Sequence, residues 1–313
     1  MTGSTFTHHT TTVDGLDWHW VEAGEGPAVV LLHGIPESWR CWQHQIPVLA
    51  RQFRVIAPDM KGYGRSGKPR DASYAGSTVA RETIAFLDSI GVGSFHIAGH
   101  DWGVVVADNI VNIVPNRVER YVRCCLSLHE YDPRNSLHHQ WNGRNPEKAS
   151  QLMANADAYV RVWFDTSCKP DTRPQESEIA EIVREFSYPG IAEVVPLYFS
   201  HIRQSEPVDY SRFTMPVLYI HGEHDPRQPI EYARGMEEHI PGLEAILVLD
   251  AGHFVTWERP DEVTNAMMWF LHSMLASGLP LFNRSRHFDL PTKPAHEVEA
   301  WGVNPGILRP KAG

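Results

Sequence analysis

The chain has 313 residues, with 28 basic and 38 acidic side chains and a formal net charge of −10 at neutral pH. Nucleic-acid binding needs clustered lysine and arginine, so this acidic balance argues against a nucleic-acid partner. Apolar residues make up 42% of the chain. They form no run of about 20, so no membrane-spanning segment is expected. The length fits one α/β core with an inserted subdomain.

The cysteines and the N-terminal residues indicate in which cellular compartment the protein is expected. The four cysteines Cys41, Cys124, Cys125 and Cys168 form no CxxC pair and no metal-ligand spacing. Residues 1–5 lack a charged region followed by an apolar one, so no secretory signal is expected. Reduced thiols in the cytoplasm are the expectation. The 18 histidines include no HExxH motif, and neither a metal nor another cofactor is expected.

Apolar segments alternate with helical patterns along most of the chain. The N-terminal residues 10–23 predict two strands that turn at Asp14-Gly15, a dipeptide typical of hairpins. Further strands are expected at 29–32, 53–57, 94–98, 118–128, 216–220 and 246–249, and helices at 38–50, 77–90, 104–114 and from 260 onward. This alternation predicts a mostly parallel, eight-stranded sheet with helices on both faces.

A sharp turn is predicted at Gly99-His100-Asp101-Trp102-Gly103, between a buried strand and an apolar helix. Glycines on either side of Asp101 tolerate a tight turn and a close crossing of strand and helix. The pattern is that of a nucleophile elbow with aspartate in place of serine. Aspartate at such a place also commonly caps its helix. Partners later in the chain favour catalysis.

Asp225 follows a later strand and His253 follows the last one, so the chain order is that of the α/β-hydrolase triad. A carboxylate is charged at pH 7 and can attack a saturated carbon without a base, which forms an ester. His253 would then activate water, and Asp225 would hold the imidazole. Glu130 and Asp132 remain alternative acids. The backbone N–H groups of Ile35 and Trp102 are the expected oxyanion hole.

Residues 129–212 lack strand–helix alternation and are rich in aromatic side chains. We expect them to form a helical lid over the carboxyl ends of the strands. The expected α/β core therefore consists of residues 1–128 and 213–283. Several prolines and few apolar runs follow, so residues 284–313 are expected to be a C-terminal extension.

Residues 33–39 (HGIPESW), 59–66 (DMKGYGRS) and the elbow resemble α/β-hydrolases of the epoxide hydrolase and dehalogenase branch. The resemblance covers about residues 20–275, and the HGxPESW form is most similar to epoxide hydrolases. Haloalkane dehalogenases often carry Asn or Glu at the place of Ile35. Fluoroacetate dehalogenases place an arginine after the nucleophile, where this chain has Trp102, so a small anionic substrate is not expected.

The resemblance implies hydrolysis of an epoxide to a vicinal diol through an alkyl ester on Asp101. Epoxide hydrolases of this branch use two lid tyrosines to protonate the ring oxygen, and Tyr159 and Tyr198 are the candidates here. Trp163 and His201 are further candidate substrate-binding residues. The many lid aromatics favour a bulky or aromatic small-molecule substrate.

Two alternatives and the assembly state stay open at this point. The first alternative is a haloalkane-type dehalogenase with the same triad, in which Trp102 and Trp163 hold the halide. The second is a non-catalytic ligand binder on the same fold. A homodimer is compatible with the sequence.

Overall fold

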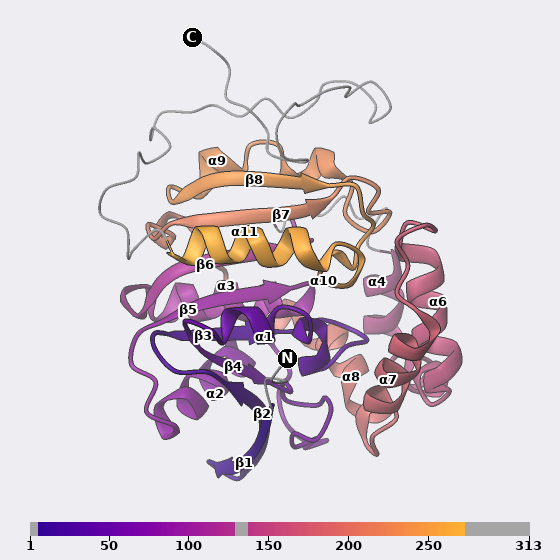
Figure 1. Cartoon of the computed structure of the whole chain (residues 1–313). Helices are drawn as coiled ribbons and strands as arrows, with labels where there is room; N and C mark the ends of the chain where they lie inside the picture. Colours follow the sequence, from indigo (N-terminus) through magenta and orange to yellow (C-terminus); the bar gives the residue numbers. More distant parts are fainter. Residues whose placement is uncertain (1–5, 129–136, 273–313) are drawn as a thin grey trace.

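The structure of the protein is a computed structural model that describes residues 6–128 and 137–272 (Figure 1). Among these residues, eight strands form one sheet in the order β1-β2-β4-β3-β5-β6-β7-β8. β2 pairs antiparallel with β1 and β4, and the other neighbours are parallel. The strands are β1 Thr7–Val13, β2 Leu16–Ala23, β3 Ala28–Leu32, β4 Arg54–Pro58, β5 Phe95–His100, β6 Val118–Cys124, β7 Val217–Gly222 and β8 Leu243–Leu249. The predicted sheet is confirmed.

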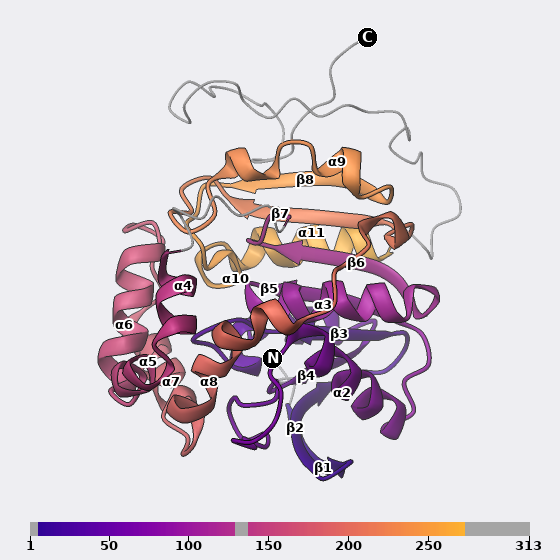
Figure 2. The same cartoon turned by 180° about the vertical axis from the view of Figure 1, so that it is seen from behind.

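Helices cover both faces of the sheet, as the two opposite views show (Figures 1 and 2). One face carries α2 (Gly76–Ser89) and α3 (Trp102–Ile113), and the other carries α1 (Ile46–Leu49) and α11 (Pro260–His272). Each face has its own cluster of buried apolar side chains. Burial of apolar surface on both sides explains why the parallel strands are nearly continuous apolar runs. The other short helices of the core are α9 (Met236–His239) and α10 (Val255–Glu258).

The N-terminal hairpin turns where the sequence predicts. Asp14 and Gly15 both have positive φ angles, 49° and 80°, and Val13 pairs with Leu16 directly across the turn. Two consecutive positive φ angles are the requirement of the type I′ turn that suits twisted strands.

The predicted continuous helix over 38–50 is wrong. A 3₁₀ turn covers Trp39–Trp42, and the short helix α1 begins only at Ile46. Pro47 explains the break, because proline inside a helix lacks the N–H donor and clashes with the carbonyl four residues earlier. In the structure it lies in the first turn of α1, where both defects are tolerated. The 118–128 strand is also shorter than predicted and ends at Cys124.

Among the described residues between β6 and β7, five α-helices lie at the end of the sheet toward which the parallel strands point (Figure 1). They are α4 Leu137–Arg144, α5 Pro146–Met153, α6 Ala156–Ser167, α7 Glu176–Phe186 and α8 Ile191–His201. We call them the inserted helices. Residues 129–136, at the start of the predicted lid, and the predicted extension 284–313 lie outside the described residues. No described helix has the length and apolar character needed to cross a bilayer.

Candidate active site

The turn between β5 and α3 is unusually tight. Asp101 has φ 50° and ψ −119°, a conformation that side-chain-bearing residues rarely adopt. A Cβ atom on Gly103 would lie 2.2 Å from the Leu32 carbonyl oxygen, and one on Gly99 would lie 2.7 Å from the Gly103 backbone. Glycine is therefore required on both sides of Asp101. Asp101 occupies the N-cap position of α3, but its side chain makes no capping hydrogen bond to that helix.

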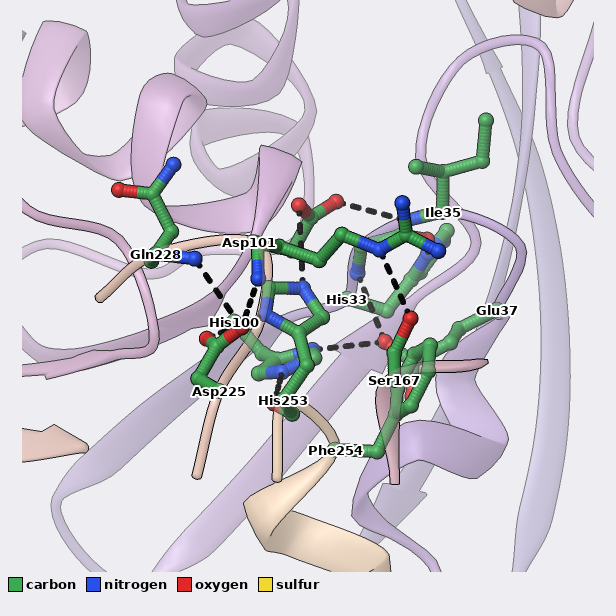
Figure 3. A network of polar contacts seen from close by, with 12 residues as sticks. His33, Ile35, Glu37, His100, Asp101, Ser167, Asp225, Gln228, His253 and Phe254 are labelled. Atoms are coloured by element: carbon green, nitrogen blue, oxygen red, sulfur yellow. Dashed lines mark hydrogen bonds and ion pairs between the residues drawn. The ribbon is translucent and has the colours of Figure 1, made fainter. Parts of the chain in front are cut away.

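Three predicted residues meet beyond the carboxyl ends of β5, β7 and β8 (Figure 3). Nε2 of His253 lies 3.4 Å from Oδ2 of Asp101, and its Nδ1 lies 2.7 Å from Oδ2 of Asp225. The other Asp225 oxygen accepts hydrogen bonds from the backbone N–H groups of Arg227 (2.7 Å) and Gln228 (3.1 Å). Asp225 is thereby fixed against the imidazole. Glu130 and Asp132, the alternative acids, lie outside the described residues.

Charges in this cluster shift one another's protonation. Burial acts to lower the pKa of His253, but the charges of Asp225 and Asp101 outweigh it and raise that pKa to about 10. Burial acts to raise the pKa of Asp101, but its hydrogen bond to His253 and the charges of His253 and His100 hold it well below the usual range. Both shifts favour an imidazolium between two carboxylates near neutral pH.

One predicted oxyanion donor contacts Asp101 directly. The Ile35 backbone N–H donates to Oδ1 of Asp101 at 3.0 Å, which leaves Oδ2 facing His253 (Figure 3). Trp102 is the first residue of α3, next to Asp101. Its ring packs edge-on against Tyr198 and Phe199, with centroids 5.4 and 5.3 Å away.

A second acid–histidine pair lies behind the first, and sequence reasoning missed it (Figure 3). Buried Glu37 contacts Nδ1 of His100 at 2.8 Å, and Nε2 of His100 donates to the carbonyl oxygen of His253, also at 2.8 Å. Glu37 also accepts the indole N–H of Trp257. The sequence signal that could have indicated this pair is the position of its members. Glu37 lies in the HGIPESW segment, and His100 directly precedes Asp101.

Helix α6 supplies two of the predicted substrate-binding residues. The Tyr159 ring stacks on Phe186. The Trp163 ring lies edge-on to Tyr159, with the two ring centroids 6.2 Å apart. Burial raises the pKa of the Tyr159 hydroxyl well above its ordinary value, and the charge of Asp101 adds to that shift. Tyr159 therefore stays protonated within the electrostatic reach of Asp101.

The other two predicted substrate-binding residues are engaged elsewhere. The Tyr198 hydroxyl donates to the Lys61 carbonyl oxygen at 2.6 Å, and Nδ1 of His201 accepts the backbone N–H of Tyr74 at 3.0 Å. Both contacts join α8 to the loop after β4. The Tyr198 hydroxyl and Nδ1 of His201 are thus used in holding the fold, and neither residue has a hydrogen bond to Asp101 among the described contacts.

Tyr63 is a buried residue that the sequence reasoning passed over. Its hydroxyl has no hydrogen-bond partner among the described residues, and its ring meets His33 edge-on at 5.0 Å. Burial raises the pKa of Tyr63 well above the ordinary value, with smaller contributions from Tyr198, Asp101 and Tyr159. A buried hydroxyl without a partner costs free energy, so it marks a place where a ligand can bond.

Three groups of described residues have the spacing of metal ligands. The groups are Glu37, Cys41 and His100; Cys125, Asp225 and His253; and Glu223, His224 and Asp250. In the first two, the carboxylate is already bonded to the histidine. In the third, which is at the surface, Asp250 pairs with His224, Lys169 and Arg259. Each group is thus accounted for by hydrogen bonds and ion pairs, and the expectation of no metal stays a prediction.

The chain is similar to proteins of one family. Residues 27–260 match the alpha/beta hydrolase fold family. The soluble epoxide hydrolase of Corynebacterium sp. (strain C12) is 31% identical over 294 residues, which cover 84% of this chain and 96% of that protein. The solved structure "Epoxide hydrolase CorEH without ligand" superposes with a TM-score of 0.73 at 28% identity, covering 87% of this chain and all of that one.

Mouse bifunctional epoxide hydrolase 2 is 28% identical over 312 residues. These residues cover 85% of this chain and 55% of that relative, so the chain spans about half of its length. The family match covers six of the eight strands, β3 to β8, and the positions of Asp101, Asp225 and His253. The chain therefore belongs to the α/β-hydrolase family, close to its epoxide hydrolases.

Proposed function

We propose that this protein hydrolyses an epoxide to a vicinal diol through a covalent ester on Asp101. The relatives named as epoxide hydrolases support the reaction class. The observation that carries the proposal is the placing of Oδ2 of Asp101 on the elbow, 3.4 Å from Nε2 of His253. An aspartate nucleophile suits a saturated carbon in a strained ring, whereas with a carboxylic ester it would form an anhydride.

In the first step, Oδ2 of Asp101 attacks one oxirane carbon while the C–O bond to the ring oxygen breaks. Alkoxide is a poor leaving group and needs a proton, which the buried hydroxyl of Tyr159 supplies. The step therefore forms one C–O bond, breaks another, and moves one proton from Tyr159 to the former ring oxygen.

In the second step, water attacks Cγ of the ester with His253 as base. Ester formation removes the Asp101 charge that helps to raise the pKa of His253. That pKa then falls, the imidazole becomes neutral, and the proton it gives up replaces the one lost by Tyr159. The Ile35 N–H donates to Oδ1 as it becomes the oxyanion. The diol leaves with Oδ2 and one water proton, while the other proton stays on His253.

A single turnover in ¹⁸O-labelled water, with enzyme in excess over styrene oxide, tests the route. Water attacks Cγ, so the label is expected in the peptide that contains Asp101 and not in the diol. Mass spectrometry of the peptide and of the diol measures which of them carries the label. Label in the diol alone would mean direct attack of water on the epoxide, which would contradict the ester.

Substituting Asp225 by asparagine is expected to lower kcat by about three to four orders of magnitude. Asparagine can still accept the two backbone N–H groups that Asp225 holds. However, it places an amide against Nδ1 of His253 and removes the charge that stabilises the imidazolium. Steady-state kinetics on styrene oxide measures the effect. Near-normal turnover would move the role of the acid to Glu130 or Asp132.

Substituting Tyr159 by phenylalanine is expected to slow alkylation of Asp101 by about 10²-fold, because the alkoxide loses its proton donor. Tyr198→Phe is the matched control, since that hydroxyl bonds the Lys61 carbonyl and its loss should affect the melting temperature more than the rate. Rapid-mixing fluorescence of the alkylation phase provides the readout. Full alkylation rate in Tyr159→Phe would transfer the role to Tyr63.

The dehalogenase alternative shares the triad and differs in the leaving group, because halide leaves without a proton. Release of bromide from bromoalkanes, with no diol from epoxides, would favour it. We further propose that the protein acts in a reducing compartment such as the cytoplasm. The support is that Cys41, Cys124, Cys125 and Cys168 are free thiols. The absence of nucleic-acid partners and a homodimer stay predictions.

A further inference from the structure

Arg227 joins the loop of the triad acid to helix α6. Its backbone N–H donates to Oδ1 of Asp225 at 2.7 Å. Its side chain reaches α6, where Nε donates to Oγ of Ser167 at 2.9 Å and Nη2 donates to Oγ1 of Thr166 at 2.6 Å. The guanidinium carbon lies 4.5 Å from the centroid of the Trp163 ring. The charge is therefore held in one place between the acid loop and an inserted helix.

This arginine differs from other buried and half-buried arginines of the chain. Arg40, Arg54 and Arg123 each have a carboxylate within 3.2 Å. Among the residues that the structure describes, both hydrogen-bond partners of the Arg227 side chain are neutral hydroxyls, and no carboxylate lies within ion-pair distance. A partly buried charge without a directly paired carboxylate is costly, and a guanidinium has five N–H donors, of which two are used among the described residues.

The charge of Arg227 acts on the reacting groups. Burial lowers the pKa of Arg227, against opposing contributions from Asp225, Tyr159 and Asp101. Conversely, Arg227 acts to lower the pKa of Tyr159. Asp225 and Asp101 are not free to neutralise it, because their oxygens already bond His253, backbone N–H groups and the Ile35 N–H. The guanidinium lies over Trp163, whose ring is edge-on to Tyr159, so it lies one ring away from the proposed proton donor and has donors left over among the described residues.

The geometry points to Arg227 as the recognition site for a carboxylate on the substrate, which would be an epoxy acid with a short spacer. A guanidinium fork matches a carboxylate in shape and charge. Trp163 offers an aromatic surface beside it. The arginine comes from the acid loop and not from the position after the nucleophile, which is why the sequence comparison with fluoroacetate dehalogenases gave no sign of it. The inference rests on the proposed epoxide hydrolysis.

Matched acid and amide substrates test the proposal. We would compare 3-phenylglycidate with 3-phenylglycidamide, and the homologues with one or two methylenes between oxirane and carbonyl. In at least one pair, kcat/KM of the acid should exceed that of the amide by about 10- to 100-fold. Arg227→Gln should bring this ratio to about 1, and Arg227→Lys should keep part of it. Ser167→Ala, which removes a support but no charge, should retain the preference.

A binding measurement separates this inference from the proposed function. By calorimetry, unreactive 3-phenylpropanoate should bind wild type about tenfold more tightly than 3-phenylpropanamide, and Arg227→Gln should lose the difference. If the enzyme hydrolyses amides as well as acids in every pair and binds both unreactive compounds equally, the role of Arg227 is overturned. That result leaves the proposed epoxide hydrolysis standing. If no epoxide is hydrolysed, the epoxy-acid substrate falls with the proposed function, and calorimetry still decides whether Arg227 selects carboxylates.

Discussion

Asp101→Asn is expected to lower kcat for epoxide hydrolysis by about five to six orders of magnitude, the loss seen when a covalent nucleophile is removed. The amide has the size of the carboxylate, and it can still accept the Ile35 N–H that Asp101 holds at 3.0 Å. It cannot attack carbon, because its oxygen carries no full charge. Residual diol formation, measured by chromatography after long incubation, checks the size of the loss. Mass spectrometry confirms that the side chain has remained an amide.

The same variant has an electrostatic signature that does not depend on turnover. The charges of Asp225 and Asp101 raise the pKa of His253 to about 10 against the effect of burial. The Asp101→Asn substitution removes one of the two charges, so the pKa of His253 should fall, and the imidazolium should lose its proton at a lower pH. Nitrogen chemical shifts of the imidazole across a pH titration measure the change. An unchanged titration would mean that Asp101 and His253 do not interact in solution.

The meeting of Asp101, Asp225 and His253 could be predicted because each follows a parallel strand, and parallel strands present their carboxyl ends at one edge of the sheet. The Ile35 donor followed from its place after another strand. Long-range polar contacts could not be predicted from the sequence. Tyr198 donates to a carbonyl 137 residues away, and a helical pattern does not say which backbone atom a hydroxyl will meet.

Two further features show the same limit. Nothing in the spacing of Glu37 and His100 indicates that they form a buried pair whose far nitrogen reaches the His253 carbonyl. The guanidinium of Arg227 reaches Thr166 and Ser167, about 60 residues earlier, only because the inserted helices fold back over the strand ends. The break in the expected 38–50 helix, by contrast, could have been predicted from the sequence, because the steric effect of Pro47 is local.

His253→Gln is expected to separate the two halves of the reaction. Asp101 keeps its charge and can still open the epoxide, whereas no base remains to activate water. Steady-state kcat should therefore fall by about five to six orders of magnitude, while one equivalent of epoxide is consumed in a rapid first phase. Intact-protein mass spectrometry should then show a species heavier by the full mass of the epoxide, with the adduct on the peptide that contains Asp101. Treating Asp101→Asn in the same way should give no adduct. A His253→Gln variant that consumes no epoxide would place the histidine in the ring-opening step, because the ester could not then form without it.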